Sequence, residues 1–288
     1  MFALLLTLTI ATQNPMLVST EWLAEHAGLS RVIVVEVGDD FTYAKGHIPG
    51  ARLLRWENLV VERDGLANEL PSGEQLESLF TSLGIGDTTR VVFYSREPLK
   101  ATRAWFTIDY LCHGHRASVL DGGLQKWIGE GRPLSREWPE VKAAKFTSFL
   151  NPATTIAFDR LRALVQKRGK LDVPLVVIDA RPTMQFLGIE AGKDIDRSGH
   201  IPGAINIPWT TNLMPDEKRF RTREELLAMY DGANLTHDSI LIAYCRSGVE
   251  ASMTYFALRY LGYDVALYDG SFLEWSGKET AIAKVINP

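Results

Sequence analysis

Short apolar runs alternate with longer segments of helical periodicity along the C-terminal half of the chain. The apolar runs predict strands near residues 175–179, 239–244 and 264–268. The periodic segments predict helices near residues 157–168, 222–230 and 248–261. Uninterrupted apolar strands are typical of a parallel sheet that helices cover on both faces. The pattern therefore predicts an α/β fold, a parallel sheet flanked by helices.

The N-terminal half repeats this pattern. The hexapeptide Gly-His-Ile-Pro-Gly-Ala occurs at residues 46–51 and again, letter for letter, at 199–204. Four further segments recur in the same order: 31–36 with 175–179, 72–75 with 222–225, 91–94 with 241–244, and 121–127 with 269–275. A repeat of roughly 150 residues is a whole domain rather than a solenoid unit. The sequence therefore predicts an internal duplication of two such α/β domains.

The domain limits follow from the repeat. We expect a first domain at residues 16–137, a linker at 138–153 that has neither periodicity, and a second domain at 154–288. Residues 1–15 form an apolar N-terminal extension that is too short to span a membrane. The extension could be a signal peptide, although no positively charged segment precedes its apolar run. The alternatives are a packed extension or a start at Met16, so the compartment, cytoplasmic or exported, stays open.

The composition excludes several classes of partner. The chain has 288 residues, 46% of them hydrophobic, and a net charge of -4 with no long block of like charge. We therefore expect no nucleic-acid partner and no membrane partner. The two cysteines and six histidines have no metal-ligand spacing. We expect no metal and no organic cofactor.

Cys245 directly follows the apolar run that ends at Tyr244 and precedes a predicted helix. In open α/β sheets, ligands bind beyond the carboxyl ends of the strands. Backbone N–H groups of a short loop and a helix N-terminus favour the thiolate form. Such surroundings can lower the pKa of a cysteine from about 8.5 to about 3.5–7.5. We therefore predict that Cys245 is a nucleophile with a lowered pKa.

The first copy has no equivalent thiol. Ser95 occupies the matching position, and Pro98 removes one backbone donor from its loop. Because this position holds no thiol and no motif places a base beside Ser95, we expect the first domain to wall the site of the second domain rather than to react. The second cysteine, Cys112, lies in a helix-patterned aromatic stretch and is interpreted as a small buried hydrophobic residue. A Cys112–Cys245 disulfide is the alternative.

Together, these features resemble the tandem rhodanese family, the thiosulfate and 3-mercaptopyruvate sulfurtransferases. The resemblance rests on the two Gly-His-Ile-Pro-Gly-Ala turns, the Asp179-Ala180-Arg181 segment, the Cys245 loop and the two Asp-Gly…Trp endings. It covers the chain from Met16 onward and implies two rhodanese-like domains, of which the second is catalytic. It also implies transfer of a sulfane sulfur from thiosulfate to cyanide or a thiol through a Cys245 persulfide.

The loop sequence leaves the donor open. Thiosulfate enzymes of the family usually have Cys-Arg-Lys-Gly-Val-Thr, and mercaptopyruvate enzymes have Cys-Gly-Ser-Gly-Val-Thr or close to it. Arg246 favours thiosulfate, whereas Ser247 favours 3-mercaptopyruvate. A third reading is a sulfur carrier that passes its persulfide to a protein acceptor. The residue six after Cys245 is Ala251, so the Cys-x5-Arg loop of cysteine phosphatases is absent.

The resemblance implies a set of substrate-binding residues around the catalytic Cys245: Arg181, Arg246, Ser247, Gly248, Val249 and Glu250. Arg181 matches the family arginine that contacts the anionic end of the donor, and its alternative is an ion pair with Asp179 or Glu250. Glu250 departs from both family loops. We expect it to face outward from the first turn of the helix, where a carboxylate suits the helix dipole.

The two histidines of the repeated turns, His47 and His200, are interpreted as structural. The same turn occurs in the copy that lacks a cysteine, so catalysis does not explain both. Trp127 and Trp275 occupy matching positions near the ends of the two copies. We expect both indole rings to anchor the cores.

Overall fold

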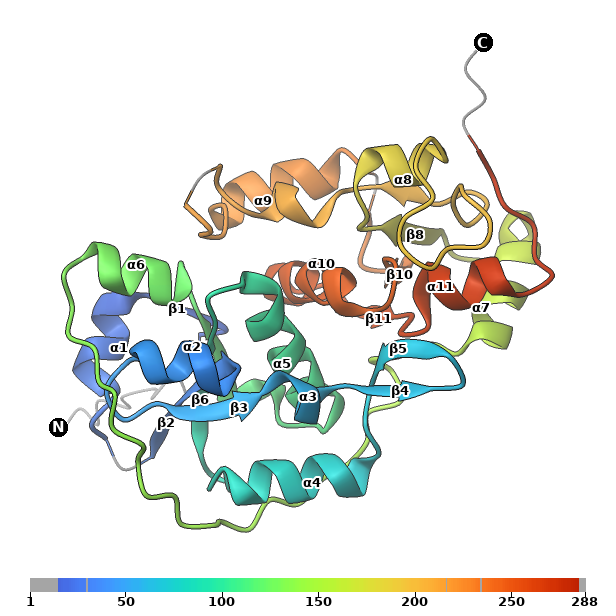
Figure 1. The fold of residues 1–288 in the computed structure, drawn as a ribbon. Coiled ribbons are helices and arrows are strands. Elements are labelled where there is room, and N and C mark those ends of the chain that lie inside the picture. Colours follow the sequence, from blue (N-terminus) through green and yellow to red (C-terminus); the bar gives the residue numbers. More distant parts are fainter. Residues whose placement is uncertain (1–14, 30, 216, 234, 285–288) are drawn as a thin grey trace, which may run out of the picture.

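The computed structural model describes residues 15–29, 31–215, 217–233 and 235–284, which form two α/β domains (Figure 1). Residues 1–14 of the predicted N-terminal extension lie outside the described residues. The two sheets differ by one strand but have the same order of matching strands. The predicted duplication of an α/β fold with parallel sheets is therefore confirmed.

The first domain is built on a five-stranded parallel sheet in the order β1-β7-β6-β2-β3. Its strands are β1 (Leu17–Val18), β2 (Val32–Gly38), β3 (Arg52–Arg55), β6 (Arg90–Tyr94) and β7 (Ala117–Leu120). Its helices are α1 (Thr20–His26), α2 (Asp40–Lys45), α3 (Trp56–Leu59), α4 (Gly73–Ser82), α5 (Pro98–Tyr110) and α6 (Gly123–Gly129). An antiparallel hairpin of β4 (Val61–Arg63) and β5 (Leu66–Glu69) lies outside this sheet.

The second domain has a four-stranded parallel sheet in the order β11-β10-β8-β9. Its strands are β8 (Leu175–Asp179), β9 (Ile205–Asn206), β10 (Ile240–Tyr244) and β11 (Val265–Leu267). Its helices are α7 (Phe158–Gln166), α8 (Thr183–Leu187), α9 (Arg223–Asp231), α10 (Val249–Leu261) and α11 (Ser271–Gly277). The strands and helices predicted for this half agree with these bounds to within two residues. No helix in the described ranges is long and apolar enough to cross a membrane.

The repeated residues make the same contacts in both copies. The hydroxyl of Tyr94 accepts the backbone N–H of Ile48 at 3.0 Å, and the hydroxyl of Tyr244 accepts that of Ile201 at 3.1 Å. These bonds tie the last residue of the central strand to the Gly-His-Ile-Pro-Gly turn. The repeated sequence thus encodes a repeated connection between strand end and turn.

The predicted roles of the repeated histidines and tryptophans agree with the structure. His47 and His200 are buried and stack on Tyr43 and Phe186, respectively. Each ring places Nδ1 within hydrogen-bond distance of a backbone carbonyl. Each tryptophan ring is buried and donates its indole N–H to the carbonyl six residues further on. The two histidine rings thus hold the repeated turns, and the two tryptophan rings hold the segments that end each copy.

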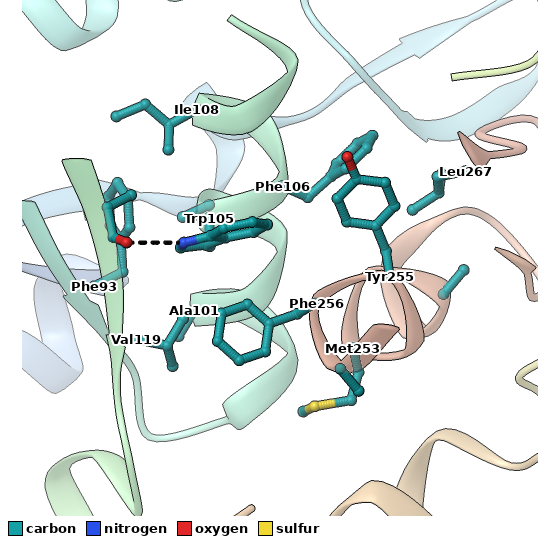
Figure 2. Packing of buried hydrophobic residues seen from close by; sticks show 14 of the residues in the cluster. Phe93, Ala101, Trp105, Phe106, Ile108, Val119, Met253, Tyr255, Phe256 and Leu267 are labelled. Carbon is teal, nitrogen blue, oxygen red and sulfur yellow. Dashed lines mark hydrogen bonds between the residues drawn. The ribbon is translucent and has the colours of Figure 1, made fainter. Parts of the chain in front are cut away.

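The two domains pack through their equivalent helices, α5 and α10 (Figure 1). Figure 2 shows the aromatic rings between them. The ring centres of Trp105 and Phe256 are 5.0 Å apart, those of Phe106 and Tyr255 are 4.9 Å apart, and both pairs are edge-on. The hydroxyl of Tyr255 donates to the buried Asp109 carboxylate at 2.8 Å. Because one apolar cluster extends across both helices, the domains share a core.

The two Asp-Gly motifs connect the domains in a reciprocal way. Asp121 of the first domain accepts the backbone N–H of Phe220 at 2.8 Å, and Asp269 of the second accepts that of Leu70 at 2.8 Å. Leu70 follows the β4–β5 hairpin, which therefore lies against the second domain (Figure 1). This contact brings a segment of the first domain to the end of the Cys245 strand.

Candidate active site

Cys245 lies at the carboxyl end of β10, in the loop that leads into α10. Its side chain is almost fully buried, with 1% relative exposure. The thiol faces the backbone N–H groups of Ser247 and Ala251, both of which favour the thiolate. The 13-residue helix α10 begins at Val249, so the positive end of its dipole lies beside the sulfur. The predicted N–H groups of the loop and of the helix N-terminus are present beside the sulfur.

Ser271 holds this loop from the start of α11. Its hydroxyl oxygen accepts the N–H of Cys245 at 3.2 Å and the N–H of Gly248 at 3.0 Å. The same oxygen is 2.8 Å from the carbonyl of Tyr268 and 4.0 Å from Cys245 Sγ. Sequence patterns gave no signal for Ser271 beyond its place in the second Asp-Gly motif. It fixes both ends of the loop.

Gly248 is required by the geometry of the loop. It has a left-handed backbone with φ 81. A Cβ built there would lie 2.4 Å from Asp269 Oδ1 and 3.0 Å from its backbone oxygen. Any side chain would therefore displace the loop from Asp269, while a contact of Gly248 with substrate stays a prediction.

A pocket of about 270 Å³ opens over the thiol, and both domains line it. The second domain contributes Cys245, Arg246, Ser247, Val249 and Glu250, and the first contributes Trp56, Asn68, Glu97, Leu99 and Lys100. The loop residues predicted to bind substrate are thus gathered around Cys245, except that the backbone turn at Gly248 lies beneath the pocket. The first domain forms the opposite wall, as expected.

Two cationic side chains face this pocket. Arg246 stands on the Cys245 loop, and Lys100 comes from α5 of the first domain. Lys100 Nζ lies 2.9 Å from the Glu97 carboxylate and 5.9 Å from the centre of the Trp56 ring. No sequence pattern pointed to Lys100, because its helix belongs to the copy without a cysteine.

The expected lowering of the Cys245 pKa is wrong. Burial, and after it the charge of Glu250, raise the pKa of the Cys245 thiol to about 12. Hydrogen bonds from the N–H groups of Ala251 and Ser247 and from Ser271 oppose this shift without cancelling it. The desolvation of an anion outweighs the loop's donors. The thiol of this structure therefore carries its proton.

The predicted outward orientation of Glu250 is also wrong. Its half-buried side chain lines the pocket, and the charge of its carboxylate raises the pKa of the Cys245 thiol. Because α10 starts at Val249, Glu250 is the second residue of the helix, and its side chain lines the same pocket as Cys245. Burial raises the pKa of Glu250, while the charge of Arg246 opposes the shift. A carboxylate thus lies beside the nucleophile.

This contact predicts a faster reaction of Cys245 in the Glu250→Gln variant. The carboxylate raises the pKa of the thiol, so its removal lowers that pKa and increases the thiolate fraction at any pH below it. We expect iodoacetamide, which alkylates the thiolate already present and needs no proton relay, to inactivate the variant about threefold or more faster near neutral pH. The pH dependence of inactivation measures this. An unchanged or slower reaction would contradict the placement of Glu250.

Arg181 is placed by the structure in the ion pair that was the alternative to donor contact. It is fully buried, and its guanidinium contacts the Asp179 carboxylate at 2.5 Å and the carbonyl of Gly199 at 2.7 Å. It does not line the pocket described above. Burial disfavours its charge, but the hydrogen bonds and charge of Asp179 raise the pKa of Arg181. Arg181 is thus a fixed charge beneath Cys245, and direct contact with a donor stays a prediction.

Two residues of the first domain hold the loop from the other side. The amide of Asn68 donates to Ser247 Oγ at 2.9 Å. Arg103, on α5, is fully buried and contacts Asp269 Oδ1 at 2.6 Å and the carbonyl of Gly248 at 3.4 Å. Asn68 had no sequence signal. Arg103 had a weak one, since it is the one charge inside the apolar stretch 101–108 of its helix.

The equivalent site of the first domain is closed. Ser95 is buried, and its hydroxyl donates to the carbonyl of Val37 at 2.7 Å. The space beside it, about 10 Å³, is lined by Lys218 and Phe220 of the second domain. Lys218 also donates to the carbonyl of Arg96 at 3.4 Å. This agrees with the expectation that the first domain does not react.

Both expectations for Cys112 are wrong. Cys112 is exposed rather than buried, and both cysteines are free thiols. It follows α5 in a left-handed backbone with φ 63, where the chain turns out of the helix. That turn directs the side chain to the surface, away from Cys245. Among the described residues, no group of three His, Cys, Asp or Glu side chains gathers as a metal site.

Comparison with known proteins places these features in context. The Rhodanese-like domain matches the chain twice, at residues 19–130 and 159–278. The chain is 35% identical to the sulfur carrier protein TtuD of Thermus thermophilus over 273 residues, which cover 90% of this chain and 93% of that protein. It is 33% identical to the thiosulfate sulfurtransferase of Bos taurus, over 90% of this chain and 91% of that protein.

A solved structure has the same architecture. The crystal structure of SseA from Escherichia coli, described as a 3-mercaptopyruvate sulfotransferase, superposes with a TM-score of 0.78 and 29% identity. The superposition covers 90% of this chain and 99% of SseA. The similarity thus extends over both domains.

Proposed function

Because the chain belongs to the rhodanese family and is a sulfurtransferase, we propose that it moves a sulfane sulfur from thiosulfate to cyanide or a thiol through a persulfide on Cys245. In the first half-reaction, Cys245 Sγ attacks the outer sulfur of thiosulfate and sulfite leaves. In the second, the acceptor attacks the outer sulfur of the persulfide and frees Cys245. No cofactor takes part in this proposal.

One observation carries the proposal: Cys245 is the only thiol among the residues that line the pocket. Its sulfur faces N–H groups that stabilise the negative charge of a thiolate or persulfide. The outer sulfur of a persulfide would extend into the pocket of about 270 Å³, a volume suited to a small ion.

The charges at the pocket favour thiosulfate as the donor. Arg246 and Lys100 face the pocket from opposite domains, so a small dianion could lie between two cations. The loop of this chain has Ser247 where thiosulfate enzymes usually have lysine. We propose that Lys100 supplies that second cationic contact from the first domain.

Two alternatives keep specific support. The amide of Asn68 donates to Ser247 Oγ, which leaves the serine proton free to bond a ketoacid donor such as 3-mercaptopyruvate. The similarity to a sulfur carrier protein supports a relay to a protein acceptor. Such a relay would load a persulfide stoichiometrically and turn over small acceptors slowly.

Two assays separate these functions. Thiocyanate formation from thiosulfate and cyanide is measured beside pyruvate release from 3-mercaptopyruvate. We expect the larger kcat/KM with thiosulfate. A larger value with 3-mercaptopyruvate would overturn the choice of donor, and persulfide loading with negligible turnover of either would favour the carrier.

A lysine variant tests the role of the first domain in donor binding. Replacing Lys100 by methionine removes one of the two pocket cations and should raise KM for thiosulfate about fivefold, with a smaller effect on kcat. The exposed Lys170, outside the pocket, gives the matched control Lys170→Met. The rise in KM should shrink at high salt, because screening weakens the interaction that the variant lacks. An unchanged KM would show that Lys100 does not bind the donor.

A further inference from the structure

The Glu250 carboxylate is not used by the sulfur transfer proposed above, yet it lies beside the nucleophile. Glu250 and Cys245 line the same pocket, and the charge of the carboxylate acts on the thiol. A proton can pass between two such groups directly or through one water molecule. The arrangement also opens to the pocket, where a substrate would meet both groups together.

Sulfur transfer to a thiol needs a path for one proton. The thiol of Cys245 carries a proton before it is loaded, because burial and Glu250 raise its pKa to about 12. That proton must leave when the persulfide forms. An acceptor thiol must lose its own proton in the second half-reaction, when Cys245 regains one. Each half-reaction therefore needs a base next to Cys245 Sγ.

The other ionisable groups that line the pocket are poor candidates for that base. Lys100 and Arg246 are cations at neutral pH and have no free lone pair to accept a proton. Glu97 is 66% exposed in its side chain and pairs with Lys100 at 2.9 Å. The two buried histidines of the Gly-His-Ile-Pro-Gly turns do not line the pocket. Glu250 is the remaining base in contact with the sulfur.

Charges of both signs surround Glu250. The groups that act on it or face it across the pocket are Cys245, Arg246, Asp179, Arg181, Glu97 and Lys100. Burial raises the pKa of the carboxylate, and Arg246 limits that rise. A carboxylate of raised pKa is a stronger base that still releases a proton readily.

We propose that Glu250 relays the proton between Cys245 and both substrates, and that the acceptor class this site serves is a neutral thiol. The proposal rests on the proposed function. In loading, the Cys245 proton passes through Glu250 to the leaving sulfite, which departs as hydrogen sulfite. In discharge, the acceptor sulfur bonds to the outer persulfide sulfur while the bond from that sulfur to Cys245 breaks.

The electron pair of the broken bond stays on Cys245 Sγ, which receives the acceptor's proton through Glu250. Thiosulfate and a thiol thus become hydrogen sulfite and a persulfide anion, with charge and proton conserved. An anionic acceptor such as cyanide brings no proton and meets the negative carboxylate. The relay therefore helps a thiol and gives no help to cyanide.

The test is the single-turnover discharge of a persulfide-loaded enzyme, wild type against Glu250→Gln. The acceptors are 2-mercaptoethanol over a range of pH and cyanide at alkaline pH. Without the relay, only the few per cent of thiol already ionised near neutral pH can attack. We expect the variant to discharge to the thiol at least about tenfold more slowly there. Its rate should then rise with pH in parallel with ionisation of the thiol, while discharge to cyanide is unchanged or faster.

The matched control is Glu224→Gln, which removes an exposed carboxylate outside the pocket and should not change the ratio of the two discharge rates. Equal slowing of both acceptors in Glu250→Gln, or parallel pH profiles in variant and wild type, would overturn the relay. Loading with inorganic polysulfide makes this test independent of the donor. Failure of the wild type to load from any donor would overturn the proposed function, and the relay with it.

Discussion

Replacing Cys245 by serine is expected to reduce thiocyanate formation from thiosulfate and cyanide by at least about 10³-fold. A serine hydroxyl fits the loop, because the N–H groups of Ser247 and Ala251 can donate to its oxygen as they do to the sulfur of Cys245. It cannot form the sulfur–sulfur bond that carries the transferred atom. The loss should appear in kcat, with the fold unchanged by circular dichroism.

The control for this variant is Cys112→Ser, which removes the only other cysteine of the chain. Because Cys112 is exposed and belongs to the first domain, its removal should leave turnover unchanged. Loss of activity in Cys112→Ser, or retention of it in Cys245→Ser, would contradict the assignment of the nucleophile.

Replacing Arg103 by methionine should have the second large effect, on both stability and activity. Arg103 is fully buried and pairs with Asp269 across the domain interface. Its removal leaves the Asp269 charge with one backbone donor, Leu70 N–H, and breaking a buried pair in this way costs about 3–5 kcal/mol. Arg103 also bonds the carbonyl of Gly248, so the Cys245 loop loses a support.

Urea denaturation measures the loss of stability. Persulfide loading of the folded variant, at low urea concentration, measures the effect on the Cys245 loop. The double variant Arg103→Met/Asp269→Asn removes both charges and should recover part of the unfolding free energy. Because the two residues are in contact, the two single changes should not be additive. Additive losses would show that the pair does not hold the domains together.

The sequence is sufficient to predict the fold and the position of Cys245 at the carboxyl end of a central strand. The strands of the second domain are continuous apolar runs, and the duplicated Gly-His-Ile-Pro-Gly turns fix the copies relative to each other. Cys245 follows a central strand, a position that topology alone makes a ligand site. These features depend on local pattern and on repetition, which a sequence carries directly.

The properties of the site that depend on tertiary contacts were not predictable. Lys100 and Asn68 reach the pocket only because α5 packs on α10 and the hairpin crosses to the second domain. The orientation of Glu250 depends on which residue begins α10, because a shift of one residue along a helix turns a side chain to another face. The pKa of Cys245 depends on how deeply the loop is buried, and the donors of the loop alone suggested the opposite direction.

The exposure of Cys112 was missed for a related reason. The apolar pattern of α5 continues to Leu111, and the left-handed turn at Cys112 has no glycine or asparagine to mark it. A small sulfur residue in an aromatic stretch was therefore assigned to the core. The left-handed backbone at the end of α5, rather than the apolar neighbours of Cys112, determines that its side chain is exposed.

The central claim is that Cys245 carries the transferred sulfur as a persulfide. Its most direct test is mass spectrometry of the protein after brief incubation with thiosulfate, followed by alkylation and peptide mapping. We predict the mass of one additional sulfur atom on the peptide that contains Cys245 and its loss after addition of a thiol or cyanide. A peptide that remains unmodified while turnover proceeds would contradict the account.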